Sequence, residues 1–299
     1  MRIDLHTHST ASDGTLTPAE VIVAAARAGL DVVALTDHDT TAGWAAAVEV
    51  LPPGLTLVRG AEVSCRWYGV DPSAHSGSRT AWGEPERPSI GLHLLAYLFD
   101  PGEPALADEL RRVREARERR AERMVELLRA DGVDLTWEEV LGYAAGGTVG
   151  RPHLARALVG RGLVGTVGEA FRSQWLGQRY RVPKQDIEVF RALDLILAAG
   201  GVPVFAHPAA SVRGRIVPDS LIVELAAAGL AGLEADHEDH TPEQRTHVRA
   251  LAAQLGLLVT GSSDFHGSNK TVRLGAYTTA PEAYQRIVEM AHGVPPVSG

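Results

Sequence analysis

The chain has 299 residues, of which 45% are hydrophobic and 22% charged, and its formal net charge is −8. These values are typical of a globular protein with a sizeable core, and an acidic surface does not favour binding to duplex DNA. No apolar run reaches the roughly 20 residues of a membrane span, and the first residues do not form a signal peptide. With Cys65 as its single cysteine, the chain cannot form an intrachain disulfide, and we expect a cytoplasmic protein.

The N-terminal segment carries the first polar residues that suggest chemistry. Residues 2–6 include two apolar positions and are expected to form a short buried strand. Side chains alternate across a strand, so His6 and His8 point to the same side. Asp13 follows in a turn with Gly14 and adds a carboxylate. These donors suit a transition metal, although a His-x-His pair alone also arises by chance.

Helices and strands alternate through the next fifty residues. Thr17 and Glu20 form a capping-box pattern, which predicts the start of a helix. Helices are expected at 17–29 and 41–50, and strands at 31–36 and 55–58. This alternation predicts parallel pairing in an α/β sheet or barrel.

The alternation is interrupted after the third strand. Residues 66–90 mix Pro, Gly, Ser and Trp without periodicity, which predicts a long loop or a short hairpin. His75 lies in this segment and is interpreted as an ordinary surface histidine. The next strand is expected at 92–98 and carries His93.

Residues 101–190 have a helical pattern that differs from the segments on either side. A long helix is expected at 106–130, followed by shorter helices. Between Arg111 and Arg129 the chain has eight Arg and four Glu. This stretch is either a solvated helix surface with i,i+4 ion pairs or a patch that guides a polyanion.

The alternation of helices and strands resumes after Lys184 and continues towards the C-terminus. Helices are expected at 186–199, 218–228 and 241–255, and strands at 202–206, 230–235 and 257–260, before a last strand and helix. The chain thus divides into a barrel built from residues 1–100 and 191–299 and a mainly helical subdomain at 101–190.

Histidines and carboxylates gather in or near the C-terminal ends of the expected strands. Parallel α/β architectures build their sites at that end. Packing does not explain so many of them, because buried imidazoles and carboxylates without partners are costly. Nine residues are therefore predicted metal ligands: His6, His8, Asp13, His38, Glu62, His93, His207, Asp264 and His266.

Nine candidate ligands are too many for one ion and divide naturally among two or three ions that share a carboxylate. Clustered divalent ions promote hydrolysis of phosphate esters, because they generate hydroxide near neutral pH and bind both the attacking and the leaving oxygen. No P-loop, dinucleotide-binding glycine motif or Gly-x-Ser-x-Gly elbow competes with this interpretation.

As an ordered set, these motifs resemble those of the PHP (polymerase and histidinol phosphatase) superfamily, and they span most of the chain. The resemblance implies a distorted (β/α)7 barrel with a trinuclear metal centre. The matching segments are His6-Thr7-His8 with Ser12-Asp13-Gly14, Thr36-Asp37-His38-Asp39, Gly60-Ala61-Glu62-Val63-Ser64, His93, His207-Pro208 and Ser263-Asp264-Phe265-His266-Gly267.

The resemblance also implies a ligand assignment for three divalent ions, with Mn²⁺ expected and Fe²⁺ or Zn²⁺ as alternatives. The first ion would be held by His6, His8, Glu62 and Asp264. The second would share Glu62 and be held also by His93 and His207. The third would be held by Asp13, His38 and His266. His207 and Asp264 are also candidate catalytic groups for protonating the leaving oxygen, although as metal ligands they are poorly placed to carry a free proton.

Within the superfamily, the closest resemblance is to a stand-alone branch with a helical insertion after the His93 strand. That branch contains nucleoside 3′,5′-bisphosphate phosphatases and 5′-to-3′ exoribonucleases acting on short RNA, so a nucleotide or short RNA is the expected substrate. Arg151, His153 and Lys184 of the insertion would hold a second phosphate of the substrate.

Four further residues near the same rim have expected roles beside the ligands. His237 and His240 are candidates for substrate contact or for orienting a ligand. Asp37 and Asp39 are expected to orient ligand histidines through hydrogen bonds.

Two alternatives stay open at this point. The same fold could act on another phosphomonoester, such as histidinol phosphate. A chain of another class could keep the metals in a regulatory module without catalysis, although the full ligand set favours an enzyme. The oligomeric state is not determined, and the 66–90 loop lies where it could reshape the mouth of the pocket.

Overall fold

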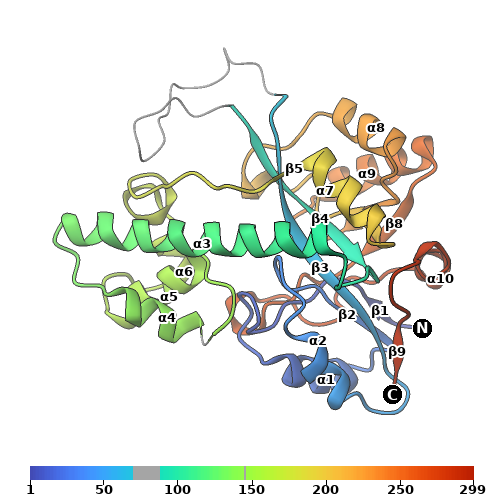
Figure 1. The fold of residues 1–299 in the computed structure, drawn as a ribbon, viewed down its shortest axis with the longest axis horizontal. Coiled ribbons are helices and arrows are strands. Elements are labelled where there is room, and N and C mark those ends of the chain that lie inside the picture. The colour runs from blue at the N-terminus through green and yellow to red at the C-terminus, as the bar shows by residue number, and fades with distance from the viewer. Residues whose placement is uncertain (70–87, 145) are drawn as a thin grey trace.

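The computed structural model describes residues 1–69, 88–144 and 146–299 (Figure 1). His75 and most of the predicted 66–90 loop lie outside the described residues. The strands are β1 (Ile3–Asp4), β2 (Val32–Leu35), β3 (Thr56–Trp67), β4 (Ile90–Tyr97), β5 (Ile187–Glu188), β6 (Val202–Phe205), β7 (Gly232–Asp236), β8 (Leu258–Gly261) and β9 (Val297–Ser298). The helices are α1 (Pro18–Arg27), α2 (Trp44–Glu49), α3 (Pro104–Ala130), α4 (Trp137–Ala144), α5 (Arg151–Gly160), α6 (Val167–Ala170), α7 (Val189–Ala198), α8 (Asp219–Ala227), α9 (Pro242–Leu255) and α10 (Pro281–Met290).

The predicted α/β barrel is confirmed as a nearly closed sheet. Its main path runs β1-β2-β3-β4-β6-β7-β8, and β5 and β9 pair with β3 off this path. The two ends of the path meet just beyond β1 and β8, where the His8 N–H donates to the Phe265 carbonyl oxygen at 2.8 Å. The segments after β1, β2, β6 and β8 are thereby gathered around one rim.

One strand departs from the expected parallel order. β4 runs antiparallel to both β3 and β6, so His93 lies within an antiparallel strand rather than at the end of a parallel one. The sequence between β3 and β4 has no helical periodicity, and parallel pairing needs a crossover connection that is usually a helix. Ser64 of β3 lies opposite His93 in this pairing, which brings both strands to the rim.

The helix ends follow the predicted capping signals closely. The Thr17–Glu20 capping box starts α1, and a second one between Thr241 and Gln244 starts α9. α2 is shorter than the expected 41–50 because its first turn begins only at Trp44. At the C-terminus the short β9 follows α10 and pairs antiparallel with β3.

The mainly helical segment after β4 has a hydrophobic core of its own. Buried residues between Ala121 and Val182 form one cluster, whereas the first half of α3, including Leu106 and Val113, packs in the barrel core. The 27-residue α3 therefore joins the two bodies, and in Figure 1 it runs from the left edge of the molecule to the barrel strands β3 and β4. No helix within the described ranges is long and apolar enough to cross a bilayer.

Candidate metal centre

The first group of ligand atoms lies just after β1. His6 and His8 are fully buried, and their Nε2 atoms lie 3.0 Å apart. These two atoms lie 3.2 and 3.1 Å from Glu62 Oε2, and 3.4 and 3.3 Å from Asp264 Oδ1. Nδ1 of His6 donates to Glu234 Oε1 at 3.0 Å, which leaves the lone pair of the ring on Nε2. Nitrogen and carboxylate donors thus converge on one point.

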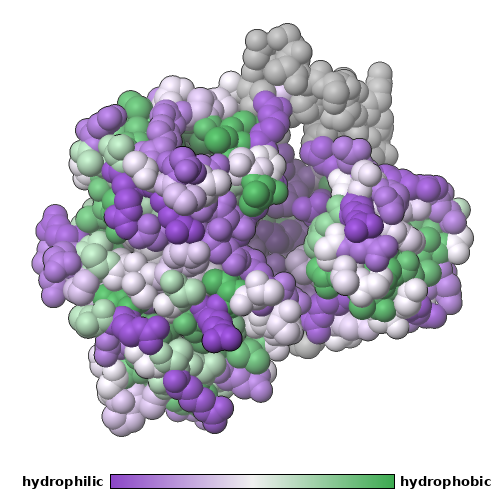
Figure 2. Space-filling model, turned by 180° about the vertical axis from the view of Figure 1, so that it is seen from behind, coloured by the Kyte–Doolittle hydropathy of each residue, from purple (hydrophilic) through white to green (hydrophobic). Residues whose placement is uncertain are grey.

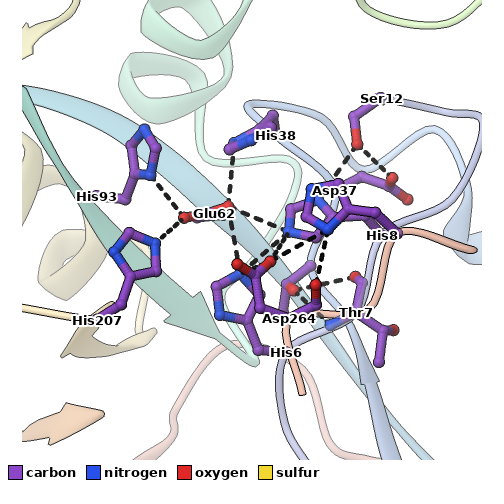
Figure 3. A network of polar contacts seen from close by, with 12 residues as sticks. His6, Thr7, His8, Ser12, Asp37, His38, Glu62, His93, His207 and Asp264 are labelled. Carbon is purple, nitrogen blue, oxygen red and sulfur yellow. Dashed lines mark hydrogen bonds and ion pairs between the residues drawn. The ribbon is translucent and has the colours of Figure 1, made fainter. Parts of the chain in front are cut away.

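Glu62 lies in the middle of the cluster (Figure 3). Its Oε1 is 2.6 Å from His93 Nδ1 and 3.1 Å from His207 Nε2, and its Oε2 is 3.1 Å from His38 Nδ1. Burial alone would raise the pKa of Glu62, but the nearby imidazoles outweigh it and hold that pKa well below its ordinary range. An ionised carboxylate with imidazoles at both oxygens is suited to bridging two cations.

A further group forms around Asp13 in the turn after β1. Asp13 Oδ1 lies 3.3 Å from His266 Nε2, and its Oδ2 lies 3.8 Å from His38 Nε2. Nδ1 of His266 lies 2.7 Å from the Asp264 carbonyl oxygen, to which it donates, so its Nε2 is free to bind. His8 stacks against His266 at 4.1 Å between ring centroids and belongs to the same group.

The arrangement of the donor atoms suits binding to divalent cations better than hydrogen bonding among themselves. His38 Nδ1, His93 Nδ1 and Asp264 Oδ1 are buried without a hydrogen-bond partner, although other ligand atoms approach them closely. Close approach of lone pairs without hydrogen-bond geometry is expected where each atom points at a shared cation. Three groups have donor atoms within 4.8 Å of one another: His6, His8, Glu62 and Asp264; His8, Asp13, His38 and His266; and His38, Glu62 and His93.

Asp264 and His207 are held in strained backbone conformations. Their φ angles are 52° and 35°, in the left-handed region that non-glycine residues rarely adopt. Asp264 Oδ2 accepts from Arg213 Nη2 at 2.6 Å, Lys270 Nζ at 2.5 Å and His237 Nε2 at 3.2 Å. These three donors saturate Oδ2 and turn Oδ1 towards the centre.

The surroundings of Asp264 and His207 favour an ionised carboxylate and a neutral imidazole. Burial would raise the pKa of Asp264, but Lys270 and His6 hold it well below its ordinary range. Burial and the Arg213 guanidinium lower the pKa of His207 to about 3. Both groups are thus suited to bind cations and poorly suited to protonate a leaving oxygen.

A cavity of about 160 Å³ opens beside the candidate metal centre, between the barrel loops and the insertion. Figure 2 shows the molecule hollowed between its two bodies. On the barrel side the cavity is lined by Asp13, His38 and His93. On the insertion side it is lined by the cationic side chains of Arg117, Arg120, Arg151 and Lys184.

On the insertion side of this cavity Arg117 pairs with Asp39, but the other cations have too few anionic partners. Burial, together with the Arg151 guanidinium, lowers the pKa of Arg120 to about 9. Asp186 favours the charged form of Lys184, but burial and the surrounding guanidinium groups outweigh it and lower the pKa of Lys184 to about 8. Depressed pKa values of this kind mark cations that lack enough anionic partners, so the cavity favours an anionic ligand.

Two predicted histidines have local partners instead of open donor atoms. His153 Nδ1 accepts from the Gly150 backbone N–H at the start of α5, and His153 is not among the residues that line the cavity. His240 donates from Nδ1 to the Ala235 carbonyl oxygen and accepts at Nε2 from the Ala209 N–H. Both ring nitrogens of His240 are therefore used in holding two loops together.

Of the other residues predicted to lie beside the ligands, His237 bonds a candidate ligand, whereas Asp37 and Asp39 bond other residues nearby. His237 accepts from the Asp239 N–H at Nδ1, so its Nε2 carries the proton and donates to Asp264. Asp37 and Asp39 do not bond a ligand imidazole, contrary to expectation. Asp37 accepts from Ser9 and Ser12 in the turn after β1, and Asp39 binds Ser64 and Arg117.

Several residues at the site carry no motif by which the sequence could reveal them. Glu234 is a buried glutamate inside β7 that bonds His6 and the His207 N–H, and its only sequence signal is a carboxylate within an apolar strand. Arg213 ends a short 3-10 helix (Ser211–Arg213), Lys270 follows another (Gly267–Asn269), and both reach Asp264 only through tertiary structure. Arg117 is one of eight arginines in its stretch, and nothing in the sequence distinguishes it.

Comparisons with known proteins agree with this geometry. Residues 4–128 match the family described as the PHP domain. The chain is 35% identical, over 88% of its length and 87% of the relative's, to a 3′,5′-nucleoside bisphosphate phosphatase from Chromobacterium violaceum. It is 33% identical to a 5′-3′ exoribonuclease from Haemophilus influenzae, over 92% of this chain and 93% of that protein.

The fold comparison points the same way. A crystal structure described as a putative metal-dependent phosphoesterase from Bifidobacterium adolescentis superposes with a TM-score of 0.83 at 34% identity. The match covers 97% of this chain and 96% of the other, so it includes both the barrel and the helical insertion.

Proposed function

The chain belongs to the PHP domain family and is a metal-dependent phosphoester hydrolase, and on that premise we propose that it removes the 3′-phosphate of nucleoside 3′,5′-bisphosphates. We extend the proposal to short RNA with a 5′-phosphate, from which the same reaction would release 5′-mononucleotides. The observation that carries it is a cavity bounded by candidate ligand residues on one side and by four cations on the other. Such a cavity suits a substrate with two phosphates, one to be hydrolysed and one to be held.

The nine predicted ligands are proposed to hold three divalent ions, with Mn²⁺ as the first candidate metal. His6, His8, Glu62 and Asp264 would hold one ion, and Asp13, His38 and His266, with His8 nearby, would hold another. The third would lie at Glu62 with His93 and His207, which both contact Oε1 of that carboxylate. When bound, such ions supply a nucleophilic hydroxide at neutral pH and neutralise phosphoryl oxygens.

The chain's own residues would bind and orient the second phosphate. Arg151 stacks on Phe171 at 5.2 Å and keeps its guanidinium at the cavity wall. Arg120 is fixed by donation from Nε to the Val182 carbonyl oxygen at 2.6 Å. With Lys184, these groups offer forked and point-like donors to one phosphate, and they lie in a fixed arrangement before substrate binds.

The proposal is tested by phosphate release with added Mn²⁺ from adenosine 3′,5′-bisphosphate, 3′-AMP, 5′-AMP and histidinol phosphate. We expect fast release from the bisphosphate only, and mononucleotide release from a 5′-phosphorylated RNA. Arg151→Gln should raise KM for the bisphosphate about tenfold, because it removes a charge-assisted hydrogen bond. Arg119→Gln, on the exposed face of α3, is the matched control and should leave KM as in the wild type.

Other outcomes assign the enzyme differently. Preference for histidinol phosphate would keep the metal centre and discard the second-phosphate cavity as the basis of specificity. If the wild-type protein binds three equivalents of metal but releases phosphate from none of these substrates, the regulatory alternative is favoured.

A further inference from the structure

The loop after β6 is exposed beside the candidate metal centre. All residues from 211 to 216 are exposed, whereas the ten residues before them are buried. Val212 exposes 76% of its surface and Ile216 46%, which is unusual for two apolar side chains on one short loop. Arg215 on the same loop has no hydrogen-bond or ion-pair partner in the described part of the chain.

Arg213 ties this loop to the centre. Its Nε donates to Asp239 Oδ2 at 2.6 Å and its Nη2 to Asp264 Oδ2 at 2.6 Å. Its Nη1 lies 3.0 Å from His207 Nε2. If that imidazole lone pair binds a cation, Nη1 loses its acceptor and is left as a donor beside the centre.

The loop and the cation-lined cavity contact different candidate ligands of the centre. The cavity reaches it through Asp13, His38 and His93. Arg213 reaches it through His207 and Asp264, and neither of these lines the cavity. A group attached to the reacting phosphate but lying outside the cavity would therefore meet the loop.

The proposed reaction requires a place for such a group when the substrate is RNA. Water oxygen bonds to phosphorus, the P–O3′ bond breaks, and O3′ of the released nucleotide takes a proton. The phosphate stays on O5′ of the following nucleotide, which is attached throughout the reaction. In a nucleoside 3′,5′-bisphosphate the same position holds only an oxygen.

We propose that residues 211–216 form the subsite for the nucleotide on the 3′ side of the scissile phosphate. Arg213 Nη1 donates to an oxygen of the reacting phosphate. Val212 and Ile216 contact the base and ribose of that nucleotide, and Arg215 attracts the next phosphate of the strand. This inference rests on the proposed function and separates its RNA branch from its mononucleotide branch.

The test compares adenosine 3′,5′-bisphosphate with 5′-phosphorylated diadenylate on the full-length, Mn²⁺-loaded protein. For the double variant Val212→Ser/Ile216→Ser, the ratio of kcat/KM for the dinucleotide to that for the bisphosphate should fall about tenfold. The matched control is Val23→Ser/Val50→Ser, which removes apolar side chains of 39% and 38% exposure on α1 and after α2. The control should keep the wild-type ratio.

A second readout measures binding without turnover. A fluorescent 5′-phosphorylated dinucleotide with a methylene group in place of the bridging O3′ cannot be cleaved, and its Kd follows from anisotropy. We expect the Val212→Ser/Ile216→Ser variant to raise this Kd about tenfold. The corresponding trinucleotide carries the next phosphate of the strand, and for it Arg215→Gln should raise the Kd severalfold and weaken its salt dependence.

The outcomes separate this inference from the proposed function. Without phosphate release from the bisphosphate by the wild type, the proposed function itself fails. If the wild type cleaves both substrates and the loop variants leave the ratio and the Kd as they were, the subsite is wrong. A wild-type enzyme that cleaves the bisphosphate and not the dinucleotide also overturns it.

Discussion

At the scale of single residues, Glu62 shows how one buried carboxylate can organise a candidate metal centre. Five imidazoles, those of His6, His8, His38, His93 and His207, lie within 3.2 Å of its two oxygens. The imidazoles belong to segments far apart in the chain, and a shared anion is what lets them approach one another. Glu234 repeats the device on a smaller scale by holding the His6 ring and the His207 backbone.

Lys184 gives the proposed phosphate pocket a pH dependence. Its pKa is lowered to about 8, so the ammonium group is present below that pH and lost as pH rises through it. We expect kcat/KM for the bisphosphate to fall about tenfold as pH rises through this pKa, because one charge-assisted contact is lost. Lys184→Arg keeps its charge at these pH values, so its profile should lack this limb. Identical alkaline limbs in the two proteins would exclude Lys184 from substrate binding.

At the scale of elements, α3 resolves the two interpretations of its arginine-rich sequence by having two faces. Arg111, Arg112 and Arg119 form ion pairs with neighbouring acidic residues on the solvent side. Arg117 points inward, with Nε 2.9 Å from Asp39 Oδ2 and a further bond to Ser64. The inward face thus connects the insertion to the loop that carries His38.

The two faces should differ in their contribution to stability. Arg117→Ala would leave the buried Asp39 carboxylate without its guanidinium partner and should lower the free energy of unfolding by about 3 kcal/mol. Arg119→Ala removes an exposed pair with 3.7 Å between charged atoms and should change it by less than ~1 kcal/mol. Urea denaturation of both variants measures the difference. Equal values would mean that the Asp39 pair contributes no more than a surface pair.

At the scale of the whole molecule, the proposed ligand residues would link the barrel strands through one centre. Their carboxylates and imidazoles come from segments after β1, β2, β6 and β8 and from within β3 and β4. Cations bound there would favour the folded state, because the unfolded chain does not assemble these ligands. The insertion has a separate core, and α3, the pairing of β5 with β3 and the Thr148–Ala11 backbone bond join it to the barrel, so bound cations would stabilise it indirectly.

Metal removal should therefore lower stability as well as activity. At 1,000 times Kd a bound ion adds about 4 kcal/mol per site, so the Tm in Mn²⁺ should exceed the Tm in EDTA by several degrees. Glu234→Gln, which loses the anion that orients His6, should bind metal about 10–100-fold more weakly, which is the usual cost of losing a group that orients a metal ligand. Glu224→Gln, on the exposed side of α8, is its control. Calorimetry that finds equal Tm values with and without metal would contradict the assembled centre.

The sequence by itself determined the barrel class, most helix and strand positions, the helical insertion and the nine clustered candidate ligands. These are local or ordered features: apolar periodicity, capping boxes, and polar residues at strand ends, which the barrel topology necessarily brings to one rim. The antiparallel course of β4 escaped prediction because strand direction depends on the connection between β3 and β4, and that segment has no periodic pattern.

Tertiary structure alone decided which of many equivalent charged residues serve the site. It placed Arg117 and Arg120, out of a stretch of eight arginines, at the cavity wall, brought Arg213 and Lys270 to Asp264, and used both nitrogens of His240 in backbone bonds. Such roles depend on which side chains meet across distant loops. Sequence patterns report the local environment of a residue, whereas its partners are set by the closure of the barrel and the packing of α3 against it.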